Sequence, residues 1–277
     1  MLDAVKEKKI GEPVVVKNDL LNAFKHVEPN KIIEKGLFLV IDGIDLAGKD
    51  VQGALLLDYF ANKLHRNAIL TSEPSTSDTG KKIRQIIRQR NSATNGEKPF
   101  SPLEVQLMFT IDRGIHVIHE IEPARNEGKD VICIRYRMST KVYGMSSGID
   151  EAILDLVNSA YPDPSAMFLL DVDVDTALKR FSSRNVERAI FENKEFLENA
   201  RKLYLRLAGN TKNCFIVETP NKEDYSKVSY EEVAHAKSVL GQAASNLSDD
   251  ALRSICSVHK RIVDLINTKV LDQSIRR

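Results

Sequence analysis

The stretch Phe38-Leu-Val-Ile-Asp-Gly-Ile-Asp-Leu-Ala-Gly-Lys-Asp50 places a short apolar run directly before a glycine-containing turn. Gly43, four spacer residues and then Gly48-Lys49 match the GxxxxGK pattern of a loop that follows a buried strand and opens a helix. The glycines let main-chain N–H groups approach an anionic phosphate, and the lysine reaches the outer phosphates of a nucleotide. The stretch therefore predicts a nucleotide-binding α/β fold.

The next position departs from this pattern. Ser or Thr normally follows the lysine, and its hydroxyl holds magnesium; here the residue is Asp50. Magnesium favours oxygen ligands and uses few protein carboxylates alongside phosphates. Asp50 is therefore the candidate magnesium ligand.

The composition narrows the class of protein. The chain has 277 residues, of which 42% are apolar, and 40 basic residues face 39 acidic ones. Such a balance predicts neither nucleic acid nor a membrane as partner. No apolar run approaches the ~20 residues that span a bilayer, and the N-terminal stretch has no signal-peptide apolar region, so a cytoplasmic protein is expected. The three cysteines are widely separated, which argues against a disulfide framework and against a zinc site.

Short apolar runs alternate with helix-patterned segments between residues 36 and 220, which is typical of βαβ units and a parallel sheet covered on both faces. The expected strands are 36–42, 68–71, 130–134, 166–172 and 214–218. The expected helices are 51–64, 79–90, 102–126, 149–160, 174–184 and 194–207.

The two ends of the chain differ from this pattern. Residues 1–35 form an expected N-terminal extension with a short helix at 18–26, and 226–277 a C-terminal helical extension, leaving 36–225 as the nucleotide-binding domain. Ser229-Tyr-Glu-Glu232 resembles a capping box, and Ser248 begins a last helix. One face of that helix is apolar and either packs on its own chain or meets a dimer partner; its residues are Leu252, Ile255, Ile262, Leu265 and Ile266.

Further segments occur in an order that one family shares. They are Leu70-Thr-Ser-Glu-Pro-Ser-Thr-Ser-Asp-Thr-Gly-Lys-Lys-Ile-Arg84 (TREPxxxxxGxxIR), the stretch from Leu107 to Val117 (LLFxADRxxHV), that from Ile121 to Tyr136 (IxPALxxGxxVIxDRY), Ser139 and Tyr143 (SxxAY), that from Phe168 to Arg184 (YLDVxxxxALxRxxxR) and that from Phe196 to Ala208 (FxxxVRxxYLxLA). Ser72 replaces the usual Arg and Ile134 the usual Asp. The chain resembles the thymidylate kinase family, especially its archaeal members, over about two thirds of its length.

The resemblance implies a P-loop kinase fold, with a parallel sheet flanked by helices and extra C-terminal helices here. It implies transfer of the γ-phosphoryl group of ATP to dTMP or a related nucleoside monophosphate, giving dTDP and ADP in nucleotide biosynthesis, with Mg²⁺. It also implies a homodimer that pairs through the helix at 102–126. Such a transfer depends mostly on positioning and charge neutralisation, so it needs backbone amides and several cations.

For the donor side, the resemblance implies ATP contacts from Gly43, Ile44, Asp45, Leu46, Ala47, Gly48, Lys49, Asp50, Val51 and Arg180. The implied catalytic cations are Lys49, Arg135, Arg184 and Arg188. The arginines at 180, 184 and 188 recur every four residues, which puts them on one helical face if the helix continues. A solvated helix shows the same charge pattern; in the lid position of this family, such arginines close over ATP.

For the acceptor side, the implied contacts are Asp45, Glu73, Phe109, Arg113, Arg135, Tyr136, Ser139 and Tyr143. Phe109 would stack on thymine, although an apolar helix face also fits a core residue. Arg113 lies one helical turn further along the same face and would reach the base or the phosphate. Asp45 corresponds to a carboxylate near the sugar 3′-hydroxyl, and Arg135 would hold the acceptor phosphate.

Two interpretations follow from the changes at Asp50 and Ile134. The first is an active kinase in which Asp50 takes over the magnesium contacts of both missing groups. The second is a catalytically weakened nucleotide-binding protein that keeps the fold. A polyphosphate-using kinase also lacks the hydroxyl after its lysine, but Thr71-Ser-Glu-Pro and Asp112-Arg113 fit it poorly.

Overall fold

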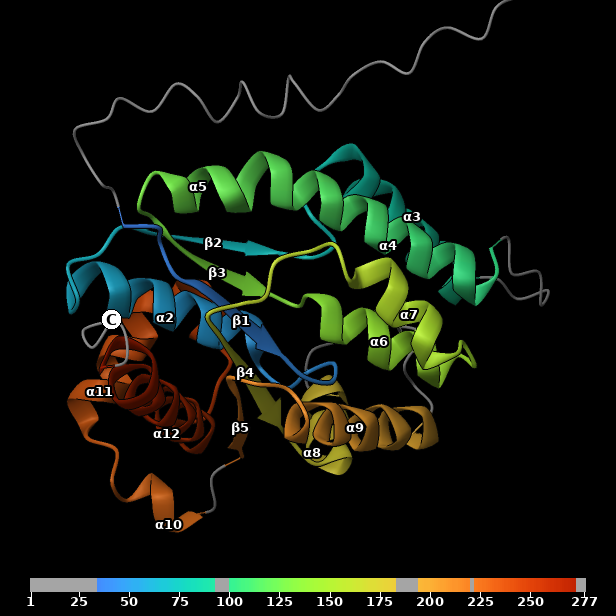
Figure 1. The fold of residues 1–277 in the computed structure, drawn as a ribbon. Coiled ribbons are helices and arrows are strands. Elements are labelled where there is room, and N and C mark those ends of the chain that lie inside the picture. Colours follow the sequence, from blue (N-terminus) through green and yellow to red (C-terminus); the bar gives the residue numbers. More distant parts are fainter. Residues whose placement is uncertain (1–33, 93–99, 183–193, 220–221, 273–277) are drawn as a thin grey trace, which may run out of the picture. The chain divides into compact units, whose positions relative to one another are not determined.

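The computed structural model describes residues 34–92, 100–182, 194–219 and 222–272, and within them five parallel strands form one sheet in the order β2-β3-β1-β4-β5 (Figure 1). The strands are β1 (Phe38–Asp42), β2 (Ala68–Ser72), β3 (Asp130–Ile134), β4 (Ala166–Asp171) and β5 (Cys214–Glu218). The predicted parallel α/β sheet is confirmed, and each strand lies within two residues of its expected bounds.

The apolar runs of the sequence form the centre of the sheet. Every residue of β1 and β3 is buried, and β1 pairs with β3 on one side and β4 on the other. The edge strands are more accessible, with Leu70 of β2 36% and Ile216 of β5 41% exposed. All strands run in one direction, so the loops that follow them meet at one edge of the sheet, where ligands bind in open α/β folds.

Helices of several lengths connect and cover the strands. They are α2 (Lys49–Asn62), α3 (Asp78–Ser92), α4 (Pro102–His116), η1 (Val117–Ile121), α5 (Glu122–Asn126), α6 (Arg137–Ser146), α7 (Glu151–Asn158), α8 (Val174–Ser182), α9 (Lys194–Gly209), α10 (Lys222–Tyr225), α11 (Tyr230–Leu240), η2 (Gly241–Ala244), α12 (Asp249–Leu265) and η3 (Ile266–Leu271). Within these residues, none of the helices is long and apolar enough to cross a membrane.

The segment predicted as one helix at 102–126 is continuous through α4, η1 and α5 (Figure 1). Ser101 begins it with a capping box, because its Oγ accepts from Glu104 N at 3.3 Å while Glu104 Oε2 accepts from Ser101 N at 2.6 Å. The π-helical turn η1 precedes Pro123, and Glu122 N donates to Val117 O. Proline has no N–H for a helical bond, and a local wide turn accommodates that loss.

The sequence prediction missed α6. Its stretch, Arg137-Met-Ser-Thr-Lys-Val-Tyr-Gly144, is rich in Ser, Thr, Val and Gly, which are poor helix formers. Met138, Val142 and Gly144 are buried in the structure. Gly144 lets the helix approach Leu154, whose Cδ atoms would lie 2.7 Å from a Cβ at this position. Tertiary packing therefore stabilises a helix that local propensity does not indicate.

The two predicted helix starts in the C-terminal segment are confirmed. Ser229 forms a capping box with Glu232, and Ser248 caps α12 by accepting from Ala251 N at 3.2 Å. Within the apolar face, Leu252, Ile262 and Ile266 have no exposed surface. The face therefore packs on its own chain, and the predicted short helix at 18–26 lies outside the described residues.

Candidate active site

A loop at residues 43–48 joins β1 to α2 at the carboxyl edge of the sheet. Gly43 has φ 143° and comes so close to β4 that a Cβ there would lie 2.7 Å from Leu170 O, which only glycine tolerates. Gly48 has φ 96° and is the N-cap of α2, without a side-chain cap. The first amides of α2 therefore lack a capping side chain, which is the arrangement that binds phosphate at helix N-termini.

Lys49 lies inside this loop with only 5% of its surface exposed. Its Nζ donates to Ile44 O at 2.6 Å and to Gly43 O at 3.1 Å. Burial lowers the pKa of Lys49 to about 7, and the nearby Arg135 adds to the lowering, whereas Asp45, Asp42 and Asp50 oppose it. A phosphate group beside this ammonium would favour its charged form.

Arg135 follows β3 in a left-handed backbone conformation with φ 66°. Its guanidinium forms an ion pair with Asp45 of the loop and donates to Ser139 Oγ at 3.1 Å. It also lies over the Tyr143 ring, 5.3 Å from the centroid, and Tyr143 Oη donates to Asp45 Oδ2 at 3.2 Å. Four of the predicted site residues are thus together, and they join the loop after β1 to the loop after β3.

A buried carboxylate that the sequence analysis did not select lies beneath this group. Asp42, the last residue of β1, has no exposed surface and accepts from Gly43 N at 2.9 Å and from Tyr204 Oη at 2.8 Å. It also accepts from Ser139 Oγ at 2.7 Å and from Ser139 N at 3.1 Å. Asp42 therefore fixes the serine that contacts Arg135, and an acidic residue ending an apolar strand just before Gly43 is the signal that could have revealed it.

Glu73 and Arg113 form a second ionic group, which is fully buried. Arg113 is 1% exposed, and its Nε donates to Glu73 Oε2 at 2.9 Å. The same guanidinium bonds Thr140 Oγ1 at 2.9 Å and the side chain of Asn158. The structure thus brings two predicted acceptor residues together, but places Arg113 in the interior, with its nitrogen atoms bound to protein groups.

The other residues predicted to contact the acceptor differ in how deeply they are buried. Phe109 on α4 is half-buried. Tyr136 has no exposed surface, donates to Pro162 O at 3.2 Å and packs edge-on against Phe38 at 5.0 Å between centroids. Near them, Asp112 is buried and accepts from Ser75 N and Ser75 Oγ at 2.6 Å each, which holds the segment after β2 against α4.

Of the lid arginines, Arg180 lies on α8 and donates to Leu46 O at 3.1 Å and to Ala47 O at 3.4 Å. It therefore contacts the phosphate loop, as expected of a donor-side residue. Arg184 and Arg188 lie outside the described residues.

The phosphate loop and the end of β3 offer few oxygen ligands for magnesium. Asp50 is exposed in the first turn of α2, whereas Ile134 ends β3 with 5% exposure and brings no oxygen ligand. Within the described ranges, no cluster of three or more His, Cys, Asp or Glu side chains is placed to hold a metal. Magnesium bound with nucleotide phosphates needs only one or two carboxylates, so one exposed carboxylate at this point fits the ion.

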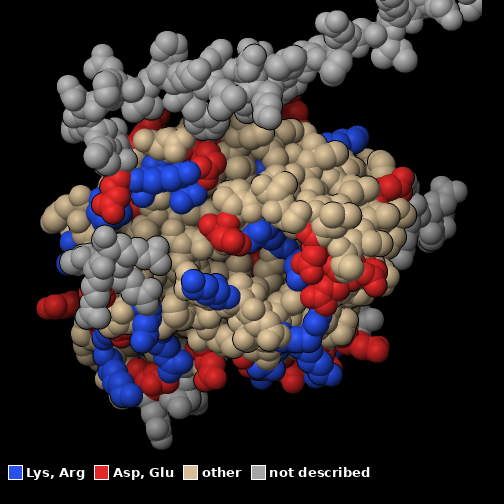
Figure 2. Space-filling model, viewed as in Figure 1, with Lys and Arg blue, Asp and Glu red and all other residues tan. Residues whose placement is uncertain are grey.

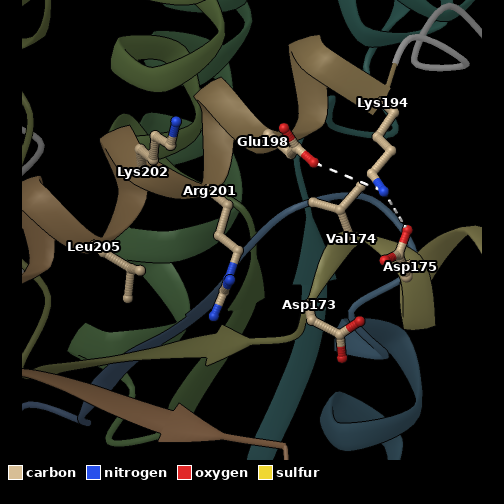
Figure 3. A pocket seen from close by; sticks show the side chains of 8 residues that line it. All are labelled: Asp173, Val174, Asp175, Lys194, Glu198, Arg201, Lys202 and Leu205. Carbon is tan, nitrogen blue, oxygen red and sulfur yellow. Dashed lines mark hydrogen bonds and ion pairs between the residues drawn. The ribbon is translucent and has the colours of Figure 1, made fainter.

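A pocket of about 300 Å³ lies between the start of α8 and α9 (Figure 3). Lys194 Nζ lies 2.7 Å from Asp175 Oδ1, and Arg201 Nε lies 2.6 Å from Asp171 Oδ1. None of its lining residues belongs to the predicted site.

On the face seen in Figure 2, acidic and basic side chains are interspersed without a large region of one sign, in keeping with the net charge of +1.

A sequence model of the thymidylate kinase family matches residues 41–228, which include the phosphate loop, Arg135, the end of β1 and the other four strands. The chain belongs to the thymidylate kinase family. A "Probable thymidylate kinase" of Pyrococcus horikoshii is 39% identical over 174 residues, which are 63% of this chain and 83% of that protein. Another from Thermococcus kodakarensis is 33% identical over 209 residues, covering 74% of this chain and 100% of that protein.

Solved structures agree on the fold of this thymidylate kinase family member. The thymidylate kinase of Ehrlichia chaffeensis has a TM-score of 0.57 and 23% identity, and the match covers 84% of this chain and 99% of that one. The thymidylate kinase of Candida albicans has a TM-score of 0.59 and 18% identity, with coverages of 84% and 92%. The predicted P-loop kinase fold is therefore confirmed.

Proposed function

We propose that this chain transfers the γ-phosphoryl group of ATP to dTMP, producing dTDP and ADP. The observation that carries the proposal is the contact between the two halves of the site, because Arg135 at the end of β3 is paired with Asp45 of the phosphate loop. A cation suited to the acceptor phosphate thus lies beside the loop suited to the donor. Membership of the thymidylate kinase family supports the same reaction and does not favour a catalytically weakened protein.

On the donor side, the amides of the loop and the first turn of α2 bind the ATP phosphates. Lys49 leaves the carbonyl oxygens of Gly43 and Ile44 and binds the outer phosphates as an ammonium. Arg180 reaches the loop from α8, and we assign Arg184 and Arg188 to the same closing function. These cations neutralise charge that develops on the transferring group.

On the acceptor side, Arg135 exchanges its Asp45 contact for the dTMP phosphate, whose oxygen attacks the γ-phosphorus as ADP leaves. Asp45 and Tyr143 then face the sugar, and Phe109 stacks on the base. The buried pair of Glu73 with Arg113, the buried Tyr136 and the Asp42-bound Ser139 shape and hold this pocket from beneath. These groups act mainly by positioning the substrates, because the protein takes little part in the covalent chemistry of phosphoryl transfer.

Mg²⁺ is part of this proposal, with Asp50 as its carboxylate ligand next to the phosphates. When bound, the ion would neutralise phosphate charge. We expect Asp50→Ser to bind and turn over Mg-ATP less well than the wild type, as measured by magnesium titration of dTDP formation. Better binding and turnover by Asp50→Ser would contradict the assignment.

We also propose a homodimer that pairs through the helix formed by α4 and η1. Four large apolar side chains on this helix are exposed, by 38 to 60%: Leu103, Leu107, Ile111 and Ile118. Their spacing of four, four and seven residues keeps them on one face, and an exposed apolar face of this kind marks an association surface. Sedimentation of the wild type and Ile111→Glu tests it: a monomeric wild type would contradict the dimer. We also propose that the protein acts in the cytoplasm, in nucleotide biosynthesis.

The first experiment is chromatographic detection of dTDP formed from dTMP and ATP, with and without Mg²⁺, using Lys49→Ala as the control. We expect magnesium-dependent dTDP that falls at least about 100-fold in the control, because a positioned charge at the transferring group is removed. dUMP in place of dTMP measures the base preference. Absence of dTDP despite measurable ATP binding would contradict the proposed function.

A further inference from the structure

Two C-terminal helices, α11 and α12, cover the helix that follows the phosphate loop (Figure 1). One face of α2 packs on the sheet through Leu56 and Phe60, which have no exposed surface. The opposite face packs through Leu55 on an apolar cluster that includes Val233, Ala236, Leu252 and Cys256. Helix α2 is therefore held between the sheet and a C-terminal layer.

The helices of this layer follow the residues that the family model matches. The family match ends at residue 228, before α11 and α12 begin. A described element outside the family match thus contacts the helix on which the donor site depends.

One polar side chain links α12 to the first turn of α2. Gln52 is 2% exposed, and its Nε2 donates to Ile255 O on α12 at 3.0 Å. Its Oε1 is buried and has no hydrogen-bond partner within the described residues. A buried amide with an unpaired acceptor stabilises the folded protein less than an apolar side chain of the same shape would. Stability therefore does not account for a glutamine at this position.

The position of Gln52 suggests what the contact does. It is three residues after Lys49, and its main-chain N donates to Gly48 O at 3.0 Å, which closes the first turn of α2. Gly48 has no side chain that could cap the helix. The orientation of this turn therefore depends on the residues that pack against it, among them those of α12. The neighbouring amides and Lys49 take their direction from that same turn.

We propose that Gln52 is a positioning residue through which the C-terminal helix α12 holds the phosphate loop in its ATP-binding geometry. The proposal deepens the proposed function and rests on it for the identity of the nucleotide. It predicts that loss of the Gln52 contact weakens ATP binding without weakening the fold.

Gln52→Met is the test variant, because methionine has a similar length and removes both the bond to Ile255 O and the unpaired acceptor. Tyr59→Phe is the matched control: it removes another bond between α2 and the C-terminal segment, from Tyr59 Oη to Asn267 Oδ1 at 3.1 Å, about two helical turns beyond Gln52. The full-length proteins are compared by calorimetric Kd for ATP, by KM for ATP and for dTMP, and by thermal unfolding.

We expect Gln52→Met to raise the Kd and KM for ATP roughly fivefold, which is the effect of one hydrogen bond, with an unchanged KM for dTMP and an unchanged or higher Tm. Tyr59→Phe should leave the ATP constants unchanged. Unchanged ATP binding in Gln52→Met, or equal weakening in both variants, would overturn the proposal. Wild-type protein that binds ATP but forms no dTDP would instead contradict the proposed function, and the comparison of ATP Kd values would still decide the role of Gln52.

Discussion

Two ion pairs in this protein use the same chemical groups in different surroundings. Arg135 and Asp45 join the two substrate loops, and their side chains are 18% and 30% exposed. Arg113 and Glu73 lie in the interior, with exposures of 1% and 2%. The first pair is partly exposed, which allows it to exchange partners for a phosphate; the second is enclosed by protein groups and keeps one arrangement. Exposure therefore separates a pair suited to catalysis from one that supports the pocket.

The largest expected effect comes from breaking the enclosed pair. Arg113→Met leaves the Glu73 carboxylate buried without its counter-ion, and we expect the free energy of unfolding to fall by about 3 to 5 kcal/mol. Urea denaturation measures the change. The double variant Arg113→Met/Glu73→Met is the control, because it removes both charges and should recover much of the loss. An undiminished free energy of unfolding in the single variant would mean that this pair does not support the fold.

Breaking the accessible pair should reduce activity strongly and stability only slightly. Arg135→Met removes the cation proposed to hold the acceptor phosphate, and we expect dTDP formation to fall about 100- to 1,000-fold. The free energy of unfolding should change by about 1 kcal/mol or less, because partly exposed ion pairs stabilise little. Kinetics and urea denaturation on the same samples measure both. A large loss of stability with little loss of activity would reverse the assignment of the two pairs.

Lys49 extends the comparison to pH, because it is buried and its amine forms no ion pair with any of the described residues. Its pKa is about 7 in the folded chain and 10.5 as a free side chain, so between these values the unfolded chain binds more protons and stability rises with pH. From pH 7 to 9 we expect the wild type to gain about 2 kcal/mol of unfolding free energy relative to Lys49→Met.

The same shift predicts proton uptake when ATP binds near pH 8, because phosphate restores the charged ammonium. Calorimetry in buffers of different ionisation enthalpy measures this uptake, and Lys49→Met should lack it. A pH-independent difference in stability between the two proteins, together with equal proton uptake, would show that Lys49 is already charged in the free protein.

The smallest effect is expected at the connection between α9 and the site. Tyr204→Phe removes one donor from the buried Asp42 carboxylate, which keeps its bonds from Gly43 N and Ser139. We expect a loss of about 1 kcal/mol in the free energy of unfolding and only a small rise in KM for dTMP. Thermal unfolding and steady-state kinetics test this, and an activity loss as large as that of Arg135→Met would make Tyr204 part of the reacting group.

The candidate site was predictable to different degrees. The loop from Gly43 to Lys49 follows from spacing alone, because a phosphate-binding turn requires glycine and lysine at set positions along one segment. Arg135 was selected through the resemblance of the stretch from Ile121 to Tyr136 to a segment of the family. Asp42 was missed, since its partners Ser139 and Tyr204 are 97 and 162 residues away in the chain. Arg113 was expected to face the nucleotide, and only the packing of Thr140 and Asn158 around it encloses its guanidinium.

The sequence by itself determined the five strands, most of the helices between them, the phosphate loop and the family, because these depend on local periodicity and on motifs within short segments. Only the tertiary structure decided which charged groups are buried together, that α6 is helical and that Gln52 meets α12. These properties arise from contacts between distant segments, where burial and paired hydrogen bonds outweigh local preference.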